Sequence, residues 1–208
     1  MSTSSKEIIL KKIRQALSNP APLPFPASEA NHSIFPTPTD DLDILFAEEF
    51  TRLLGKFAFC NDEQDMQKQL SELIEIKKWE RIYCVEEDIL RVTGITNCFN
   101  KLKDCDVSIT SCEYLIARTG SMVLSSANES GRSVSVYAPI HICIAYADQL
   151  VYDIQDGLKL LKAKYKNNIP SFITLATGPS RTADIEKTLV VGVHGPKEVY
   201  LFLVDSRS

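Results

Sequence analysis

The chain has 208 residues, of which 44% are hydrophobic and 24% are charged, and its formal net charge is −4. This length and apolar content suffice for one domain with a sizeable core, or one domain with an appendage, but exclude a second full domain. The acidic balance gives no bulk electrostatic reason to expect binding to nucleic acid or to an anionic membrane.

The N-terminal segment is expected to form an arm. Ser4 and Glu7 have the spacing of a capping box, and the apolar stripe that follows predicts a short amphipathic helix through Ile8, Ile9, Ile13 and Leu17. Six of the ten prolines lie between Pro20 and Pro38, which predicts an extended stretch. We therefore expect an arm at residues 1–38 and a domain at residues 39–208. Three placements remain open for the arm: on its own domain, on a neighbouring copy in a homo-oligomer, or on a partner.

The remainder of the chain alternates between helical and strand patterns. Helical spacing of apolar residues predicts helices at 42–54, 63–78, 87–92 and 154–165. Compact apolar runs predict strands at 56–60, 81–85, 107–110, 114–117, 122–125, 140–146, 172–176 and 199–204. Such an order predicts an α/β sandwich with a largely parallel sheet. The apolar runs are too short to span a membrane, and the N-terminus lacks the apolar core of a signal peptide, so we expect a cytoplasmic protein.

The cysteines are scattered singly along the chain. No C-x-x-C pair or Cys-His cluster occurs among Cys60, Cys84, Cys98, Cys105, Cys112 and Cys143. Iron–sulfur and zinc sites need grouped ligands, so we expect no cofactor in this chain and interpret these residues as buried thiols.

Three turns that contain glycine follow predicted strands or helices, where α/β sheets tend to bind ligands. In the second, Thr177–Ser180, Pro179 suits the first position of a helical turn, which would leave backbone N–H groups facing an anion. Arg181, and Arg118 or Arg132, would add cationic donors. The alternative is that Thr177 or Ser180 only caps a short helix. The predicted ligand-binding residues are Thr119, Gly120, Arg132, Gly178, Ser180, Arg181, Thr182, Asp184, Glu186, His194 and Gly195.

Two of the histidines have different expected roles. His194 lies between glycines, and an imidazole there can shuttle a proton or anchor a ligand. His141 lies inside an apolar strand and is expected to be a core histidine with a satisfied hydrogen bond. Asp184, Glu186 and His194 match no known metal-ligand pattern, so we expect no metal.

Several motifs in the second half occur in the order typical of one family. These are A-R-T-G-S at 117–121, Gly131-Arg132, Pro139-x-His141, T-G-P-S-R-T-A-D-I-E at 177–186 and G-V-H-G-P at 192–196. Together they resemble the signature of the LUD-domain family, and within it the LutC/YkgG group of lactate-utilization proteins. The resemblance covers about the last hundred residues. The first half is similar mainly in layout.

The resemblance implies a NagB/RpiA/CoA-transferase-like α/β fold. It also implies a role beside partner proteins in oxidising L-lactate to pyruvate, with iron–sulfur clusters in the partners. It supplies no catalytic residue for this subunit, which would bind an anionic small molecule or stabilise the complex. Relatives usually have A-E-T-G where this chain has Arg118, and this charge reversal favours an anionic ligand. The alternative is a stand-alone enzyme of the same fold that acts on a phosphorylated sugar or an acyl-CoA. An acyl-CoA transferase would need a carboxylate nucleophile, for which Glu113 and Glu129 are the nearby candidates.

Overall fold

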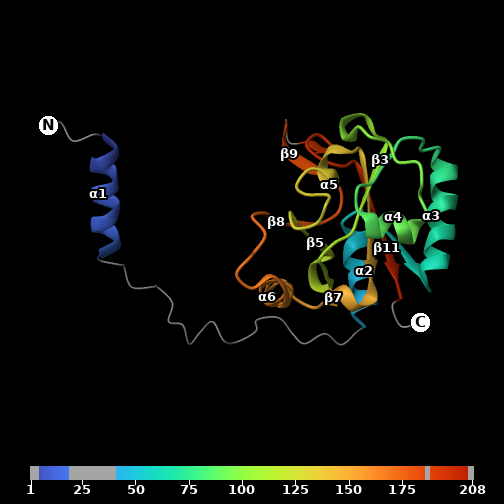
Figure 1. Cartoon of the computed structure of the whole chain (residues 1–208), viewed down its shortest axis with the longest axis horizontal. Coiled ribbons are helices and arrows are strands. Elements are labelled where there is room, and N and C mark those ends of the chain that lie inside the picture. The colour runs from blue at the N-terminus through green and yellow to red at the C-terminus, as the bar shows by residue number, and fades with distance from the viewer. Residues whose placement is uncertain (1–4, 19–40, 186–187, 206–208) are drawn as a thin grey trace. The chain divides into compact units, whose positions relative to one another are not determined.

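A computed structural model describes residues 5–18, 41–185 and 188–205, with the side chains of 16–17, 183–185 and 188–189 excepted (Figure 1). Internal contacts divide the chain into two units, Met1–Thr37 and Pro38–Ser208. In the first unit, α1 spans Ser5–Ser18, and Ile8, Ile9 and Ile13 are exposed on it. The proline-rich stretch lies outside the described residues.

A five-stranded parallel sheet forms the centre of the second unit. Its strands are β1 (Lys56–Cys60), β2 (Ile82–Tyr83), β3 (Val107–Thr110), β6 (Ile140–Tyr146) and β11 (Glu198–Val204). They lie in the order β1-β11-β6-β3-β2, and every neighbouring pair is parallel. The predicted α/β sandwich with a largely parallel sheet is confirmed.

A second, smaller sheet lies beside the first. It has the order β7-β4-β5-β8, and its members are β4 (Tyr114–Ile116), β5 (Ser121–Ser125), β7 (Leu150–Val151) and β8 (Ile173–Ala176). Strands β4 and β5 are antiparallel on either side of Gly120, and they correspond to the strands predicted at 114–117 and 122–125. Strands β9 (Arg181–Ile185) and β10 (Thr188–Val191) form a separate antiparallel pair. The sequence patterns did not predict β7, β9 or β10.

Helices cover both sheets. The helices of the second unit are α2 (Leu42–Arg52), α3 (Glu63–Lys77), α4 (Glu87–Thr93), α5 (Val134–Tyr137) and α6 (Ile154–Tyr165). Helices α3 and α4 pack on one face of the parallel sheet, α2 packs between that sheet and the smaller one, and α6 covers the smaller one. The N-caps of two helices follow from the sequence, because the side chains of Asp62 and Asp153 accept backbone N–H groups at the starts of α3 and α6.

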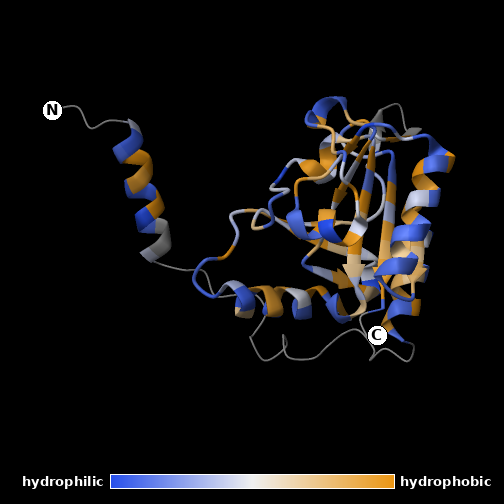
Figure 2. Ribbon diagram, turned by 45° about the vertical axis from the view of Figure 1, so that its right-hand side comes forward, coloured by the Kyte–Doolittle hydropathy of each residue, from blue (hydrophilic) through white to orange (hydrophobic). Residues whose placement is uncertain are grey.

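Strand β11 is apolar on both faces because the parallel sheet is covered on both sides (Figure 2). Tyr200, Phe202 and Val204 face the core under α3 and α4. Val199, Leu201 and Leu203 face α2 and the smaller sheet. This double burial explains why the strand is a continuous apolar run in the sequence.

Candidate functional site

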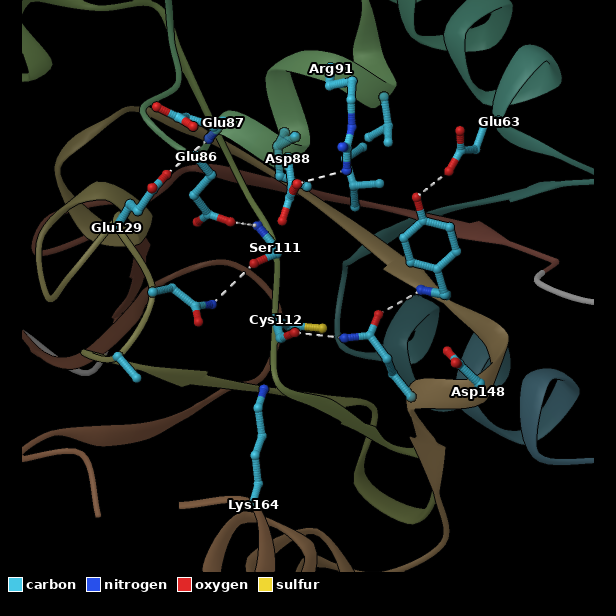
Figure 3. A pocket seen from close by; sticks show the side chains of 17 residues that line it. Glu63, Glu86, Glu87, Asp88, Arg91, Ser111, Cys112, Glu129, Asp148 and Lys164 are labelled. Carbon is cyan, nitrogen blue, oxygen red and sulfur yellow. Dashed lines mark hydrogen bonds and ion pairs between the residues drawn. The ribbon is translucent and has the colours of Figure 1, made fainter. Parts of the chain in front are cut away.

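The carboxyl edge of the parallel sheet contains a polar cavity. Strands β2, β3 and β6 end at this edge, where open α/β sheets bind their ligands. A cavity of about 700 Å³ opens there (Figure 3). It is lined mainly by polar side chains, among them Glu63, Glu86, Glu87, Asp88, Arg91, Ser111, Cys112, Asn128, Glu129, Tyr146, Asp148, Gln149 and Lys164.

Glu86 connects two walls of this cavity. Its side chain is buried, with 6% of the residue exposed. The carboxylate accepts the N–H of Ser111, after β3, at 3.0 Å and the hydroxyl of Ser130. Glu129 reaches back to the N–H of Glu87 at 2.9 Å. These bonds hold the loop after β5 over the cavity.

The opposite wall is fixed by Tyr146 and Gln149. The Tyr146 hydroxyl donates to Glu63 at 2.6 Å, and burial together with this carboxylate raises the pKa of Tyr146. Gln149 donates to the carbonyl of Cys112 at 2.7 Å and accepts the N–H of Tyr146 at 2.7 Å. The walls are therefore ordered by hydrogen bonds among the lining residues themselves (Figure 3).

Carboxylates outnumber cations in the lining of the carboxyl-edge cavity. Arg91 pairs with Asp88 at 2.7 Å, and Lys164 pairs with Glu113 at 2.8 Å, so both cations of the lining have carboxylate partners. The resulting negative potential disfavours an anion and favours a ligand that donates hydrogen bonds or carries positive charge. The carboxylates of the lining are Glu63, Glu86, Glu87, Asp88, Glu129 and Asp148.

Glu113 has a structural role beside the cavity. Its side chain is fully buried and accepts hydrogen bonds from Ser125 at 2.5 Å, Tyr165 at 2.7 Å and Lys164 at 2.8 Å. Burial alone would raise the pKa of Glu113, but the bonds from Lys164, Ser125 and Tyr165 outweigh it and lower the pKa below its usual value. The carboxylate thus ties β5 to the end of α6.

We expect Glu113→Gln to lower the free energy of unfolding by about 1–3 kcal/mol at pH 7. The amide –NH₂ group of glutamine would face one of the donors that now bind the carboxylate, which are Ser125, Lys164 and Tyr165. The lowered pKa means that the charge stabilises the fold above the unfolded pKa of about 4.3, and that this contribution is lost as pH falls through the folded value. Urea unfolding at pH 7 and at pH 3 measures both effects. The control Asp88→Asn, in an exposed pair, should change stability little. Equal losses in the two variants would contradict this role.

Three of the predicted ligand-binding residues, Gly120, Gly178 and Arg181, lie around the end of α2. Gly120 has φ +57°, and a Cβ there would lie 2.5 Å from the backbone nitrogen of Phe50. Gly178 has φ +68°, and a Cβ there would lie 2.5 Å from the carbonyl oxygen of Leu53. Arg181 donates to the same Leu53 carbonyl at 2.5 Å. These residues therefore allow close approach to α2 and satisfy one of its terminal carbonyl groups.

A chain of hydroxyl groups joins the turn at Gly120 to the turn at Gly178. The side chains of Thr119 and Ser121 lie 2.8 Å apart, and those of Ser121 and Thr177 also lie 2.8 Å apart. Because each hydroxyl can both donate and accept, the three satisfy one another. The chain links the turn before β5 to the turn after β8.

The predicted helical turn at Pro179 is wrong. Arg181 begins strand β9 instead, paired with Val191 of β10. The Ser180 N–H, which was expected to face an anion, donates to the carbonyl of Pro196 at 2.9 Å. The Ser180 N–H thus joins the motif at 177–186 to the motif at 192–196.

Arg132 contacts a different part of the domain from Arg181. Arg132 donates to Ser171 at 2.7 Å and lies over the ring of Phe172. Thr182 belongs to β9, as does the backbone of Asp184, whose side chain lies outside the described residues. Glu186 lies outside them entirely.

His194 and Gly195 lie in a different place from Arg181. They line a second cavity at the amino edge of the parallel sheet, and the His194 ring is exposed. Gly195 also packs against Ser180 of the T-G-P-S-R-T-A-D-I-E motif, since a Cβ at Gly195 would lie 2.9 Å from the Cβ of Ser180.

Arg118 forms an ion pair within the domain. Its guanidinium donates to Asp153 at 2.6 Å, and the pKa of Asp153 is lowered by the Gln155 N–H and by Arg118. The carboxylate at the N-cap of α6 is thus the partner of this cation, and the expected bias toward an anionic ligand does not follow from Arg118.

His141 is a core histidine, as expected. It is 1% exposed, and its Nε2 lies 2.9 Å from the Thr110 hydroxyl. Burial lowers the pKa of His141 to about 4, so the ring is neutral at physiological pH. Across the described ranges, no three His, Cys, Asp or Glu side chains are grouped to hold a metal ion. Nor does any helix in them have the length and apolar character needed to cross a membrane.

A family model for the LUD domain matches residues 87–204, which include the signature residues and the lining of the carboxyl-edge cavity except Glu63 and Glu86. The chain belongs to the LUD domain family. It is 39% identical to lactate utilization protein C of Halalkalibacterium halodurans over 109 aligned residues. These residues make up 51% of this chain and 47% of the relative. It is 38% identical to lactate utilization protein C of Bacillus subtilis over 109 aligned residues. These residues make up 51% of this chain and 45% of the relative.

The matched segment spans about half the length of these curated relatives. A crystal structure of a DUF162 family protein from Deinococcus radiodurans has the same fold, with a TM-score of 0.60 at 18% identity, over 81% of this chain and 99% of that one. This likeness agrees with the α/β architecture described above.

The carboxyl-edge cavity was not predicted from the sequence, although a positional signal exists. Glu86 and Glu87 follow one predicted strand, and Ser111 and Cys112 follow another. In a parallel sheet these ends meet at one edge, so their positions indicate a site more directly than the glycine turns do.

Proposed function

We propose that this LUD-domain chain is a LutC-type subunit of a cytoplasmic system that oxidises L-lactate to pyruvate together with iron–sulfur partner proteins. In this role it binds an anionic small molecule or stabilises the complex. The observation that carries the proposal is the similarity to proteins named lactate utilization protein C.

The state of the cysteines supports a division of labour with the partners. Cys60 and Cys84 are buried, and burial raises the pKa of each to about 12. The cysteines also stand singly along the sequence, whereas iron–sulfur clusters are held by grouped cysteine thiolates. We accordingly place the electron-carrying clusters in the partners.

The acidic cavity supports the assembly role. Lactate and pyruvate are both anions, and the carboxylates of the carboxyl-edge cavity would repel them. A lysine or arginine side chain of a partner subunit matches this lining better. The alternative acyl-CoA chemistry gains no support from Glu113, whose carboxylate is fully occupied by three donors.

Deletion of the encoding gene is expected to abolish growth on L-lactate and to leave growth on pyruvate unchanged. An affinity-tagged copy should restore growth and should co-purify with cysteine-rich proteins that contain iron. Growth curves and the iron content of the purified complex are the measurements. Normal growth of the deletion strain on L-lactate would refute the proposal.

A charge-reversed rim tests the assembly role separately. The double variant with Glu87→Lys and Asp148→Lys is expected to reduce recovery of the partners at least tenfold, since both residues are exposed at the cavity. The matched control carries Glu72→Lys and Glu75→Lys on the exposed side of α3. If both double variants retain the partners equally, the cavity does not take part in assembly.

A further inference from the structure

The cavity around His194 differs from the carboxyl-edge cavity in position and in charge. Its volume is about 350 Å³, and Pro139 and Lys197, which precede β6 and β11, place it at the amino edge of the sheet. No carboxylate is present among the described residues of its lining, which are Val136, Tyr137, Pro139, Gly192, Val193, His194, Gly195 and Lys197.

Lys197 supplies positive charge to this cavity. Within the parts of the chain that the structure describes, its ammonium group has no carboxylate partner, in contrast to Lys56 and Lys164. The uncompensated charge makes the potential in the cavity positive. The exposed His194 ring lies in the same lining and can donate a hydrogen bond.

The backbone fixes Lys197 over the loop. Its N–H donates to the carbonyl of Pro139 at 2.7 Å. Gly192 has φ +78°, and a Cβ at that residue would lie 2.1 Å from Cγ of Lys197. The side-chain stem therefore lies directly on Gly192, and any larger residue there would displace it.

The loop also presents backbone donors. Its base is closed by the bond from the Gly192 N–H to the Ser180 carbonyl at 2.9 Å. The next three N–H groups, of Val193, His194 and Gly195, have no backbone acceptor among residues 5–18, 41–185 and 188–205. Successive backbone N–H groups in a bent segment can bind an anion together with a nearby cation.

Apolar surface adjoins the charged groups. Val136 and Val193 are each 43% exposed, and Tyr137 is 66% exposed. A cavity of this volume lies near the lower limit of about 300 Å³ for ligand sites. The lining thus fits a small anion that also carries a short apolar group.

We propose that the His194 cavity binds a small monocarboxylate, with Lys197 and the loop N–H groups on the carboxylate and the exposed valines against its apolar end. This inference deepens the proposed function, because L-lactate and pyruvate belong to this ligand class. Lys197 and His194 are ligand-binding residues in it, and Gly192 positions the lysine.

Calorimetric titration of the purified chain with pyruvate, L-lactate, acetate and phosphate tests this inference. We expect saturable binding of pyruvate or L-lactate and at least tenfold weaker binding by Lys197→Gln, since that change removes a charged hydrogen bond. Gly192→Ala should also weaken binding, because the added Cβ displaces the lysine. The matched control is Lys78→Gln, which removes a lysine from another cavity at the same edge.

Two results would overturn the inference. One is the absence of saturable carboxylate binding by the parent chain, including the case in which phosphate alone binds. The other is equal weakening by Lys197→Gln and Lys78→Gln. Growth of the deletion strain complemented with Lys197→Gln distinguishes the two proposals. If this variant loses binding but still supports normal growth on L-lactate, the monocarboxylate site is not part of the function. The subunit role would then still stand.

Discussion

Replacing Gly120 with alanine is expected to lower the free energy of unfolding by about 3–5 kcal/mol. Part of the loss, about 1–2 kcal/mol, comes from the left-handed φ of +57°, which an L side chain adopts at a cost. The rest comes from the helix behind it, since the new Cβ would lie 2.5 Å from a backbone nitrogen of α2 and 2.7 Å from the carbonyl carbon of Glu49. Backbone atoms cannot rotate away, so α2 must shift from both sheets.

Gly94→Ala is the matched control for this prediction. Gly94 has φ +69° at the end of α4, but a Cβ there would meet nothing within 4 Å. It should therefore lose only about 1 kcal/mol, the conformational part of the effect. Thermal unfolding is the measurement, and we expect a midpoint lowered by about 10 °C for Gly120→Ala and by about 3 °C for Gly94→Ala. Similar shifts in the two variants would show that α2 does not need this close approach.

Gly120 also illustrates why the sequence of the signature predicts a ligand site. Glycine, threonine and arginine at a strand end are typical of an anion cradle, and the same residue types permit the close approach of a helix. The sequence cannot distinguish these uses at Gly120, Gly178 or Arg181, because the partner, α2, lies far away in the chain.

Much of the fold was predictable because apolar patterns are strong where burial is complete. Strand β6 matches its predicted bounds of 140–146, since both of its faces are covered. Strands β7, β9 and β10 escaped prediction for the opposite reason. Strand β7 has two residues, and β9 and β10 form a two-stranded sheet in the described part of the chain, so no long apolar run marks them.

The two cavities were less predictable than the strands. The carboxyl-edge cavity depends on strand order, which places Glu86 beside Ser130 although 44 residues separate them. The His194 cavity was anticipated only through His194 and Gly195. Its cation, Lys197, had no motif to mark it, because an isolated lysine is ordinarily a solvated surface residue.

Acid should destabilise the domain through His141. This ring is buried between β3 and β11, beside Val107–Thr110 and Glu198–Val204 in the sheet, and burial is the cause of its pKa of about 4. The unfolded chain has a histidine pKa of about 6.5. Below that value the unfolded chain binds a proton that the folded domain does not, so the free energy of unfolding falls as pH decreases from about 6.5 to about 4.

The expected loss between pH 7.5 and pH 5 is about 2 kcal/mol, from the linkage between the two pKa values. Carboxyl groups contribute little in this interval, since they titrate in the unfolded chain near pH 4. His141→Gln can keep a hydrogen bond to Thr110 but cannot titrate, so urea unfolding of this variant should give nearly equal stability at the two pH values. His194→Gln is the control and should retain the loss, because that ring is exposed in the folded domain. If the parent and His141→Gln lose the same stability, another group causes the acid sensitivity and His141 is not buried in its neutral form.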